Sequence, residues 1–429
     1  MTISRRRFLA ATSAAVAPVL VPASALGRDG QTPPSERIEL AIVGCGGQGR
    51  RNMTRLHRAG CEIVATCDVD SAHLDDAARD ADKIDRRPAR FADHRDLLAD
   101  HDCDAVCIST PDHWHAPIAV RAAAAGKDLY VEKPLANTVG GSRAIADAVA
   151  EHGVVCQVGS HERSGGDVRR AAELVRSGRI GTLKAMVVNL PTEQNHHLDV
   201  KLTRETVLGE PPATLDFDAW CGPTQPLPYS PQRCHFHWRF VLRYGGGEMT
   251  DRGAHVIDIG HLIAGIDGAE PSQAGPTRIA AQGVRPVAGP YDTFMDYRFE
   301  AEYPGGVVMR GASSGDRGIK MVGTDGWIFV HVHGGRLEAS DPAILAGDPS
   351  GELGRVASHH ASFVEAVRMR TEPTAPVLAG HRTAVVCHLM NIAMRLGREL
   401  QWDPAAERFV DDDEANALLA APGRQPYAA

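Results

Sequence analysis

The chain has 429 residues, of which 43% are hydrophobic, and its formal net charge at neutral pH is -8. This length exceeds what one hydrophobic core usually organises, so we expect two domains. The modest excess of acidic residues, with no long basic run after the N-terminus, argues against nucleic acid as a partner.

The first 27 residues have the pattern of a twin-arginine export signal. Three adjacent arginines, Arg5 to Arg7, precede an apolar stretch that ends at Leu20, and residues 23–25 offer a small-residue cleavage site. Residues 28–35 are polar and read as a linker. No apolar run of about 20 residues follows, so we expect no stable membrane anchor after cleavage. The sequence therefore predicts a periplasmic or secreted protein that passes through the twin-arginine export machinery.

The nine cysteines do not form a recognisable framework. Their number is odd and no pair has C-x-x-C spacing, which is unfavourable for a disulfide scaffold or a zinc site. Cys45, Cys67, Cys107 and Cys156 lie in or beside apolar, strand-like runs. We expect them to be small buried hydrophobic residues.

Strand and helix patterns alternate between residues 36 and 160. This alternation predicts an open parallel sheet, that is, a dinucleotide-binding Rossmann domain. The expected strands are 38–43, 62–67, 105–109, 128–131 and 154–158, and the expected helices include 52–59 and 118–125.

Residues 161–429 predict a second α/β domain, built on an open and predominantly antiparallel sheet with one free face. The longer strands expected there are 183–189, 293–303, 307–310, 319–323 and 327–332. Two helices, expected at 358–370 and 381–400, close the chain and pack back. The fold class is α/β throughout.

A glycine-rich turn follows the first predicted strand and opens a helix. Gly44, Gly46 and Gly49 permit a tight turn and the close approach of a pyrophosphate to a helix N-terminus. Asp68 ends the second predicted strand, where its carboxylate would accept hydrogen bonds from ribose hydroxyls and repel a 2′-phosphate. The turn therefore predicts NAD as the cofactor, and the alternative is a purely structural turn. Its cofactor-binding residues also include Gly47 and Gln48.

Lys133 is the most informative residue of the first domain. It follows Glu132 and precedes Pro134, directly after a predicted strand, and so lies in the crevice where a parallel sheet binds ligands. The alternative is an ordinary surface lysine.

Asp251 and His255 form a second candidate group. They are four residues apart, so they would share one face if the segment is helical. An imidazole can act as a base near neutral pH, and a carboxylate can orient it. The alternative is a structural histidine that caps its own helix. With Lys133, these residues make a set suited to proton transfer in alcohol oxidation.

Several further residues are candidates for cofactor or substrate contacts, and domain-interface packing is the alternative for them. For the cofactor, they are Thr110, Pro111, His113, His115 and Glu132, with Lys133 beside them. For a polyhydroxylated substrate, they are Trp114, Arg163, His237, Trp238 and Arg239, with Asp251 and His255. Asp258 and His261 could bind a divalent metal, but the sequence specifies no acceptable ligand set, and we predict no metal site.

The order of these motifs resembles the glucose-fructose oxidoreductase/inositol dehydrogenase/rhizopine-catabolism (Gfo/Idh/MocA) family. The C-terminal segments 391–393, 402–404 and 414–416 resemble its secreted, signal-bearing branch. The motifs are G-x-G-x-x-G, T-P-D-x-x-H, E-K-P and G-G-G-x-x-x-D-x-G-x-H-x-x-D. The resemblance implies a Rossmann domain followed by an α/β domain often used for oligomerisation, hence a homo-oligomer. It also implies that His255 takes a hydroxyl proton, Lys133 polarises the oxygen and Asp251 orients His255.

The sequence therefore predicts an exported, NAD-dependent oxidoreductase that acts on a secondary hydroxyl of a sugar, glycoside or cyclitol. Free NAD is scarce outside the cytoplasm, so we expect the cofactor to be held tightly. One alternative is a glycosidase of the same family that oxidises C3 transiently. A second is a non-enzymatic protein that binds a sugar or nucleotide.

Overall fold

The computed structural model describes residues 37–192, 196–347, 351, 353–354 and 356–427. Contacts divide the chain into a short N-terminal unit, Met1–Ile38, and a second unit, Glu39–Ala429. The second unit contains the helices and strands below, apart from the first residue of β1. The predicted export signal (1–27) and linker (28–35) lie outside the described residues.

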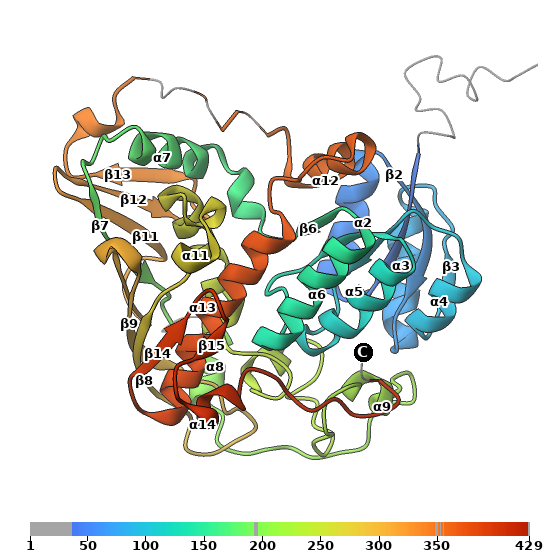
Figure 1. Ribbon diagram of the computed structural model, residues 1–429. Helices are drawn as coiled ribbons and strands as arrows, with labels where there is room; N and C mark the ends of the chain where they lie inside the picture. The colour runs from blue at the N-terminus through green and yellow to red at the C-terminus, as the bar shows by residue number, and fades with distance from the viewer. Residues whose placement is uncertain (1–36, 193–195, 348–350, 352, 355, 428–429) are drawn as a thin grey trace, which may run out of the picture. The chain divides into compact units, whose positions relative to one another are not determined.

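Within the described residues, six strands form a first sheet in the order β3-β2-β1-β4-β5-β6 (Figure 1). The strands are β1 (Ile38–Val43), β2 (Cys61–Cys67), β3 (Ala89–Phe91), β4 (Ala105–Ile108), β5 (Asp128–Val131) and β6 (Cys156–Val158). The pairs β2–β3, β1–β4, β4–β5 and β5–β6 are parallel. The strand order reverses between β1 and β4, which places a ligand crevice beyond the carboxyl ends of these strands. The predicted Rossmann-like sheet is confirmed.

The central strands of this sheet are mostly apolar and, apart from Glu39 of β1, buried, as expected for a parallel sheet covered on both faces. The helices of this half are α2 (Gly47–Ala59), α3 (Ser71–Asp82), α4 (His94–Asp100), α5 (His115–Ala124) and α6 (Val139–His152). A later helix, α12 (His359–Met369), packs against α2. Residues from the chain's second half therefore help to cover the first sheet.

Nine strands of the described chain form a second sheet in the order β13-β12-β11-β7-β10-β9-β8-β14-β15. They are β7 (Leu183–Asn189), β8 (Arg278–Val284), β9 (Asp296–Glu302), β10 (Val308–Ala312), β11 (Gly318–Gly323), β12 (Trp327–His331), β13 (Arg336–Ala339), β14 (Leu400–Asp403) and β15 (Arg408–Phe409). The pairings are antiparallel except for β7–β10, so the sheet is mixed but mostly antiparallel, as predicted.

One face of the second sheet is covered by helices and the other carries charged side chains. Along β9, Tyr297, Phe299 and Ala301 are buried, whereas Asp296 and Arg298, at alternate positions, are exposed. The buried side packs against α7 (Gly166–Arg176), α11 (Gly253–Ala264) and α13 (Val377–Leu396) in one hydrophobic core. The shorter helices of this half are α8 (His196–Leu202), α9 (Phe217–Cys221), α10 (Glu248–Asp251) and α14 (Asp413–Asn416).

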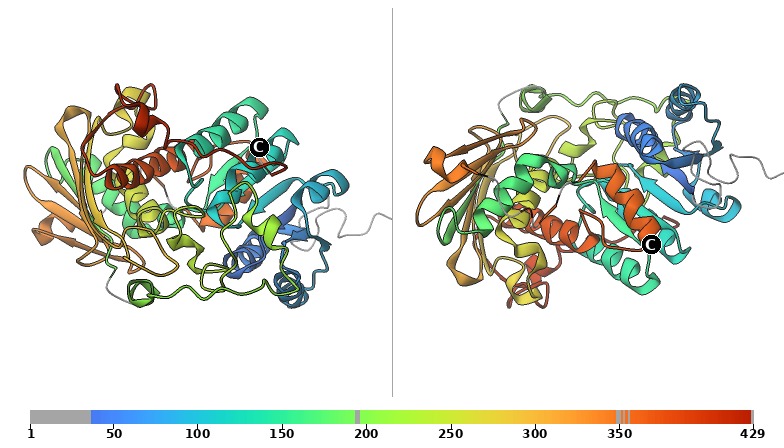
Figure 2. Two further views of the ribbon diagram at one scale, coloured as in Figure 1. Left: turned by 90° about the horizontal axis from the view of Figure 1, so that it is seen from below. Right: turned by 90° about the horizontal axis from the view of Figure 1, so that it is seen from above.

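Helix α13 joins the two halves of the molecule, and Figures 1 and 2 show it between the sheets. Ala384 belongs to the core of the first sheet, whereas its neighbour Val385 belongs to the core of the second. The Nε2 atom of His388 lies 3.0 Å from the carbonyl oxygen of Ala136, a residue of the first half. This packing fixes the second half against the Rossmann half.

All nine cysteines belong to the described residues, where they are buried and unpaired; the burial of Cys45, Cys67, Cys107 and Cys156 was predicted. Among the described helices, none combines the length and the apolar character needed to cross a membrane.

The buried His388 should make the fold sensitive to acid. Burial lowers the pKa of His388 to about 4, from an ordinary value near 6.5. Between these values the unfolded chain binds a proton that the folded chain does not. The stabilising contribution is therefore complete above pH 6.5 and is lost as the pH falls toward 4, by up to about 1.4 kcal/mol per pH unit.

We expect His388→Gln, which keeps an N–H donor but does not titrate, to reduce this dependence. Urea unfolding between pH 6 and pH 4.5 should give a slope of unfolding free energy against pH that is shallower by about 1.4 kcal/mol per pH unit. Equal slopes for the variant and the natural chain would contradict the assignment.

Candidate active site

A single pocket extends from the glycine-rich turn to the predicted proton-transfer residues. It is lined by segments that follow the carboxyl ends of β1, β2, β4 and β5, and by His161, which follows β6. The second half supplies the opposite wall, including Trp238, Arg239, Asp251 and His255. The pocket thus lies at the sheet edge where the strand order predicts ligand binding.

The glycine turn is shaped by close backbone contacts. Gly44 has a φ of +89°, and a Cβ atom there would lie 2.6 Å from the backbone of Ser109. A Cβ atom on Gly49 would lie only 1.8 Å from the carbonyl oxygen of Gly44. Gly46 precedes the first residue of α2 and offers no side-chain cap, so the first N–H groups of the helix remain for a ligand. This cradle fits a pyrophosphate, as in NAD.

Asp68 stabilises this turn through hydrogen bonds and also lines the pocket. Its carboxylate accepts hydrogen bonds from the backbone N–H groups of Cys45, at 2.7 Å, and Asp70, at 2.9 Å. The Nδ1 atom of His73 lies 3.3 Å away, and its hydrogen bond to Asp68 raises the pKa of His73. A carboxylate in this position suits the ribose hydroxyls of NAD.

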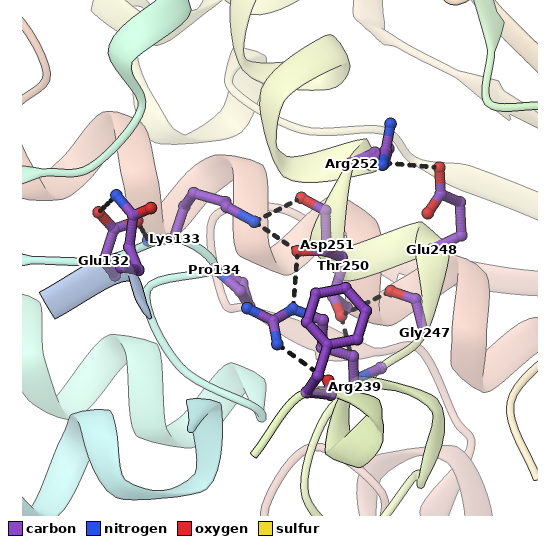
Figure 3. A network of polar contacts seen from close by, with 12 residues as sticks. Glu132, Lys133, Pro134, Arg239, Gly247, Glu248, Thr250, Asp251 and Arg252 are labelled. Carbon is purple, nitrogen blue, oxygen red and sulfur yellow. Dashed lines mark hydrogen bonds and ion pairs between the residues drawn. The ribbon is translucent and has the colours of Figure 1, made fainter. Parts of the chain in front are cut away.

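Lys133 and Asp251 form an ion pair across the pocket (Figure 3). Lys133 follows β5, and its Nζ atom lies 2.5 Å from Oδ1 of Asp251 and 3.0 Å from the carbonyl oxygen of Asp251. Asp251 ends α10 in the second half of the chain. Both side chains are mostly buried, so this pair bridges the two halves in a region of reduced solvent screening.

Arg239 adds a second positive group on the same carboxylate. Its Nε atom lies 3.5 Å from Oδ1 of Asp251, and its guanidinium lies 4.4 Å above the ring of Trp238. Burial alone would raise the pKa of Asp251, but Lys133 and Arg239 outweigh burial and hold it well below its usual range. Asp251 is therefore an anion that positions two cations.

His255 lies in the pocket wall as a neutral imidazole. Burial lowers its pKa well below the ordinary value, and the nearby Lys133, His161 and His333 lower it further. Among the described residues, its buried Nδ1 atom has no hydrogen-bond partner. A neutral imidazole can accept a proton at neutral pH.

The role expected for Asp251, the orientation of His255, needs correction. The helix is interrupted at Arg252, with α10 ending at Asp251 and α11 beginning at Gly253. Arg252 itself keeps helical backbone angles, so the boundary alone does not separate the two side chains. The carboxylate is directed to Lys133 and Arg239 instead, as Figure 3 shows.

Glu132 connects α2, the helix that follows the glycine-rich turn, to the end of β5. Its Oε1 atom accepts hydrogen bonds from Gln48, at 3.0 Å, and Asn52, at 2.9 Å. The structure places most of the expected cofactor residues around the same pocket: Gly44, Gly46, Gly47, Gln48, Asp68, Thr110, Pro111, His115, Glu132 and Lys133.

Three of the predicted contact residues turn out to be packing residues. His113 is buried, with Nε2 2.9 Å from the carbonyl oxygen of Trp220, and does not line the pocket. His237 also lies outside the pocket lining, with its ring against Tyr291. Trp114 does line the pocket, but its Nε1–H donates to the carbonyl oxygen of Ala219, at 3.0 Å, and its ring is packed edge-on against aromatic neighbours.

Arg163 is likewise structural, because it is fully buried in an ion-pair network. Its Nε atom lies 2.8 Å from Asp258, and its terminal nitrogen lies 2.5 Å from Asp267. The carboxylate of Asp258 is therefore paired with Arg163. The Nε2 atom of His261 lies 2.8 Å from the hydroxyl of Tyr303. Asp258 and His261 are therefore committed to the core and are not arranged as metal ligands.

Sequence reasoning missed several residues of the pocket wall. Asp112 is buried there, and burial raises its pKa well above the ordinary value. Tyr427, near the end of the chain, packs edge-on against Trp114 with ring centroids 5.6 Å apart. His161 directly follows the first domain, and its polar H-E-R-S segment, just after an apolar strand, was the available signal.

Comparison with known protein families agrees with this architecture. Residues 38–160 match the model described as "Oxidoreductase family, NAD-binding Rossmann fold", and residues 164–429 match "Oxidoreductase family, C-terminal alpha/beta domain". The chain therefore belongs to the Gfo/Idh/MocA oxidoreductase family, and its first half is the family's NAD-binding domain.

Curated relatives share part of the chain. A "Glycosyl hydrolase family 109 protein" of Shewanella baltica is 30% identical over 203 residues, 42% of this chain and 44% of the relative. An "Alpha-N-acetylgalactosaminidase" of Shewanella oneidensis has the same identity and coverage. The matched region thus spans less than half the length of these relatives.

Solved structures share the fold. The WlbA dehydrogenase from Bordetella pertussis, in complex with NADH and UDP-GlcNAcA, has a TM-score of 0.63 at 17% identity, covering 85% of this chain and 98% of that one. Aldose-aldose oxidoreductase from Caulobacter crescentus, complexed with glycerol, has a TM-score of 0.61 at 19% identity, covering 85% and 99% of the two chains.

The glycine turn generates a direct test of cofactor binding. In Gly49→Ala the added Cβ would overlap the carbonyl oxygen of Gly44 and force the turn open. We expect calorimetric titration of NAD into nucleotide-free protein to show at least a roughly tenfold loss of affinity, equivalent to about 1.4 kcal/mol.

Gly166→Ala is the matched control, because Gly166 begins α7 outside the pocket lining and its added Cβ would meet nothing within 4 Å. Equal NAD affinity for both alanine variants would contradict a role for the turn.

Proposed function

We propose that this protein is an NAD-dependent oxidoreductase that acts on a secondary hydroxyl of a sugar, glycoside or cyclitol. The observation that carries the proposal is the pairing of a fixed ammonium with a neutral imidazole in one pocket. Lys133 and His255 both line the pocket that begins at the glycine turn. This arrangement provides a hydrogen-bond donor and a proton acceptor beside the cofactor-binding cradle.

Lys133 binds the reacting oxygen of the substrate in this proposal. Asp251 holds the ammonium through its carboxylate and its carbonyl oxygen, which leaves further N–H donor capacity. Negative charge that develops on the oxygen during proton removal is stabilised by this preorganised donor.

His255 takes the hydroxyl proton. Its lowered pKa keeps the imidazole neutral at neutral pH, so the acceptor is available before substrate binds. NAD, when bound, supplies the hydride acceptor. Arg239, which stacks on the buried ring of Trp238 in the same wall, provides hydrogen-bond donors suited to a polyhydroxylated substrate.

A redox-neutral glycosidase is a second candidate function, and the curated relatives favour it. The matches to glycosyl hydrolase family 109 proteins extend over 203 residues of this chain. In such a reaction, transient oxidation at C3 of a glycoside permits elimination and readdition at C1. The same two side chains would serve the oxidation step, so a product assay must separate the two functions.

The proposal also includes export and self-association. The pattern of residues 1–27 supports delivery to the periplasm through the twin-arginine route, which carries folded proteins and suits a tightly held NAD. The exposed, charged face of the second sheet is the surface we assign to contacts between copies of the chain.

The catalytic proposal predicts a loss of turnover without a loss of cofactor binding. Lys133→Ala and His255→Ala should each lower turnover by roughly 10²-fold or more, because a general acid–base group is lost. The double variant should be little worse than the worse single one, since groups that act as a unit give non-additive losses. NAD affinity should persist because the glycine turn is intact.

The measurement is incubation of the mature protein with a panel of polyols and of methyl and nitrophenyl glycosides, with NADH, keto-sugar and aglycone followed separately. NADH or keto-sugar marks the oxidoreductase, and aglycone release without net redox change marks the glycosidase. Lys184→Ala and His152→Ala remove exposed residues of the same types and serve as controls. Near-normal turnover in both pocket variants would show that these two side chains are not catalytic, whereas the absence of every product with the natural protein would favour a binding protein.

The export proposal predicts that Arg5→Lys and Arg6→Lys together leave the precursor in the cytoplasm. Cell fractionation and immunodetection measure the distribution, with the natural chain as the reference. Normal periplasmic delivery of this variant through the general secretion route would contradict the proposal.

A further inference from the structure

Three side chains of types that can bind metals lie close together beside His255. His161 and Glu162 lie in the turn of 3-10 helix η5 (His161–Ser164), which follows β6, and His333 lies in the turn that follows β12. Oε1 of Glu162 lies 3.2 Å from Nε2 of His161 and 2.7 Å from Nδ1 of His333. All three possible ligand atoms lie within 4.8 Å of one another.

One member of the cluster lines the pocket, and the other two lie directly behind it. His161 lines the pocket, and its ring centroid lies 4.8 Å from that of His255. The ring of His333 lies 5.5 Å from His255. The side chain of Glu162 is 15% exposed, whereas those of the two histidines are 44% and 39% exposed. The carboxylate is therefore enclosed, and the imidazoles are open to a ligand.

The charge of the cluster suits a divalent cation. Glu162 places a carboxylate oxygen between the two imidazoles, 3.2 Å from His161 and 2.7 Å from His333. Among the described residues, no lysine or arginine forms an ion pair with Glu162, unlike Asp258, which is occupied by Arg163.

A second group with metal-ligand geometry, Asp70, His73 and His235, is less suitable. The Oδ1 atom of Asp70 already caps α3 by accepting from the N–H of Ala72, at 2.9 Å. His73 is engaged by Asp68, the carboxylate at the ribose end of the pocket. Because Asp70 and His73 already make these hydrogen bonds, the cluster of His161, Glu162 and His333 is the better candidate for a metal site.

The ligand set and spacing define the class of ion. Two imidazoles and one carboxylate suit Zn²⁺ and similar first-row ions. Ligand bonds of about 2.0 Å in a tetrahedral site place the ligand atoms about 3.3 Å apart. The two measured separations in the cluster, 3.2 and 2.7 Å, are close to this spacing. Three protein ligands leave at least one position for water or substrate.

We propose that His161, Glu162 and His333 bind one first-row divalent cation, such as Zn²⁺, whose open coordination position faces the pocket beside His255. A hydroxyl or carbonyl oxygen of the substrate would occupy that position and so be fixed relative to His255. Metal binding stands independently of the oxidoreductase proposal, whereas coordination of the substrate rests on it.

The test uses the mature, full-length protein without substrate or added NAD. After removal of metals with a chelator, titration calorimetry with Zn²⁺ alone should give about one site per chain. Glu162→Gln and His333→Ala should each weaken Zn²⁺ binding by roughly tenfold or more. His331→Ala is the matched control, because His331 lies two residues earlier and pairs with Glu338 instead. NAD affinity, measured in parallel, verifies that each variant folds.

A new absorption band would complement these losses of Zn²⁺ affinity. His333→Cys keeps a metal ligand in this position, so it should bind Co²⁺ with a thiolate-to-cobalt absorption band that His331→Cys lacks. A stoichiometry near zero in the natural protein would overturn the proposal. So would unchanged affinity in Glu162→Gln and His333→Ala, or a loss of binding in His235→Ala alone. Because no readout depends on turnover, these outcomes are distinct from failure of the proposed function.

Discussion

The ion pair between Lys133 and Asp251 is the constraint on which the candidate site depends. It joins the end of a parallel strand in the first half to the end of a short helix in the second. Loss of one partner would leave the other charge mostly buried and uncompensated, which typically costs about 3–5 kcal/mol for a fully buried pair. The exposed fractions of 14% and 17% place this pair below that limit. The pair nevertheless holds the two walls of the pocket in a fixed relative position. The ion pair between Arg239 and Asp251 supports the same carboxylate.

The architecture was largely predictable because the central strands leave a strong apolar signal. Residues 128–131 and 183–189 were expected as strands, and the structure gives the same bounds for β5 and β7. Helices α3 and α4 were missed, since α3 is rich in charge and α4 is short, and aspartate caps are the main local signal for both. The edge strands β3 and β13 were also missed, because they are short and half exposed, without a continuous apolar run.

The site was predictable where function depends on local motifs and less so where it depends on contacts between distant segments. The glycine turn and Lys133 could be placed because each follows a recognisable buried strand. The partner of Asp251 could not, because Lys133 lies 118 residues earlier in the chain and the spacing of Asp251 and His255 gives no sign of that contact. Arg163 was misjudged for a related reason. A lone arginine has no periodic signature, and its partners Asp258 and Asp267 come much later in the chain. His333 is far from His161 in the sequence, and it lies near His161 because the second sheet places the turn after β12 there.

The position of Tyr427 has a consequence for the order in which the protein matures. This residue forms part of the wall beside Trp114, and its hydroxyl donates to Asp218 at 2.9 Å. Domains of a growing chain generally fold in order of synthesis. Here the earliest domain acquires one wall of its nucleotide pocket from residues that leave the ribosome hundreds of residues later. A ribosome-bound intermediate can form the parallel sheet, but it lacks that wall. The nucleotide pocket therefore acquires this wall only after Tyr427 has left the ribosome.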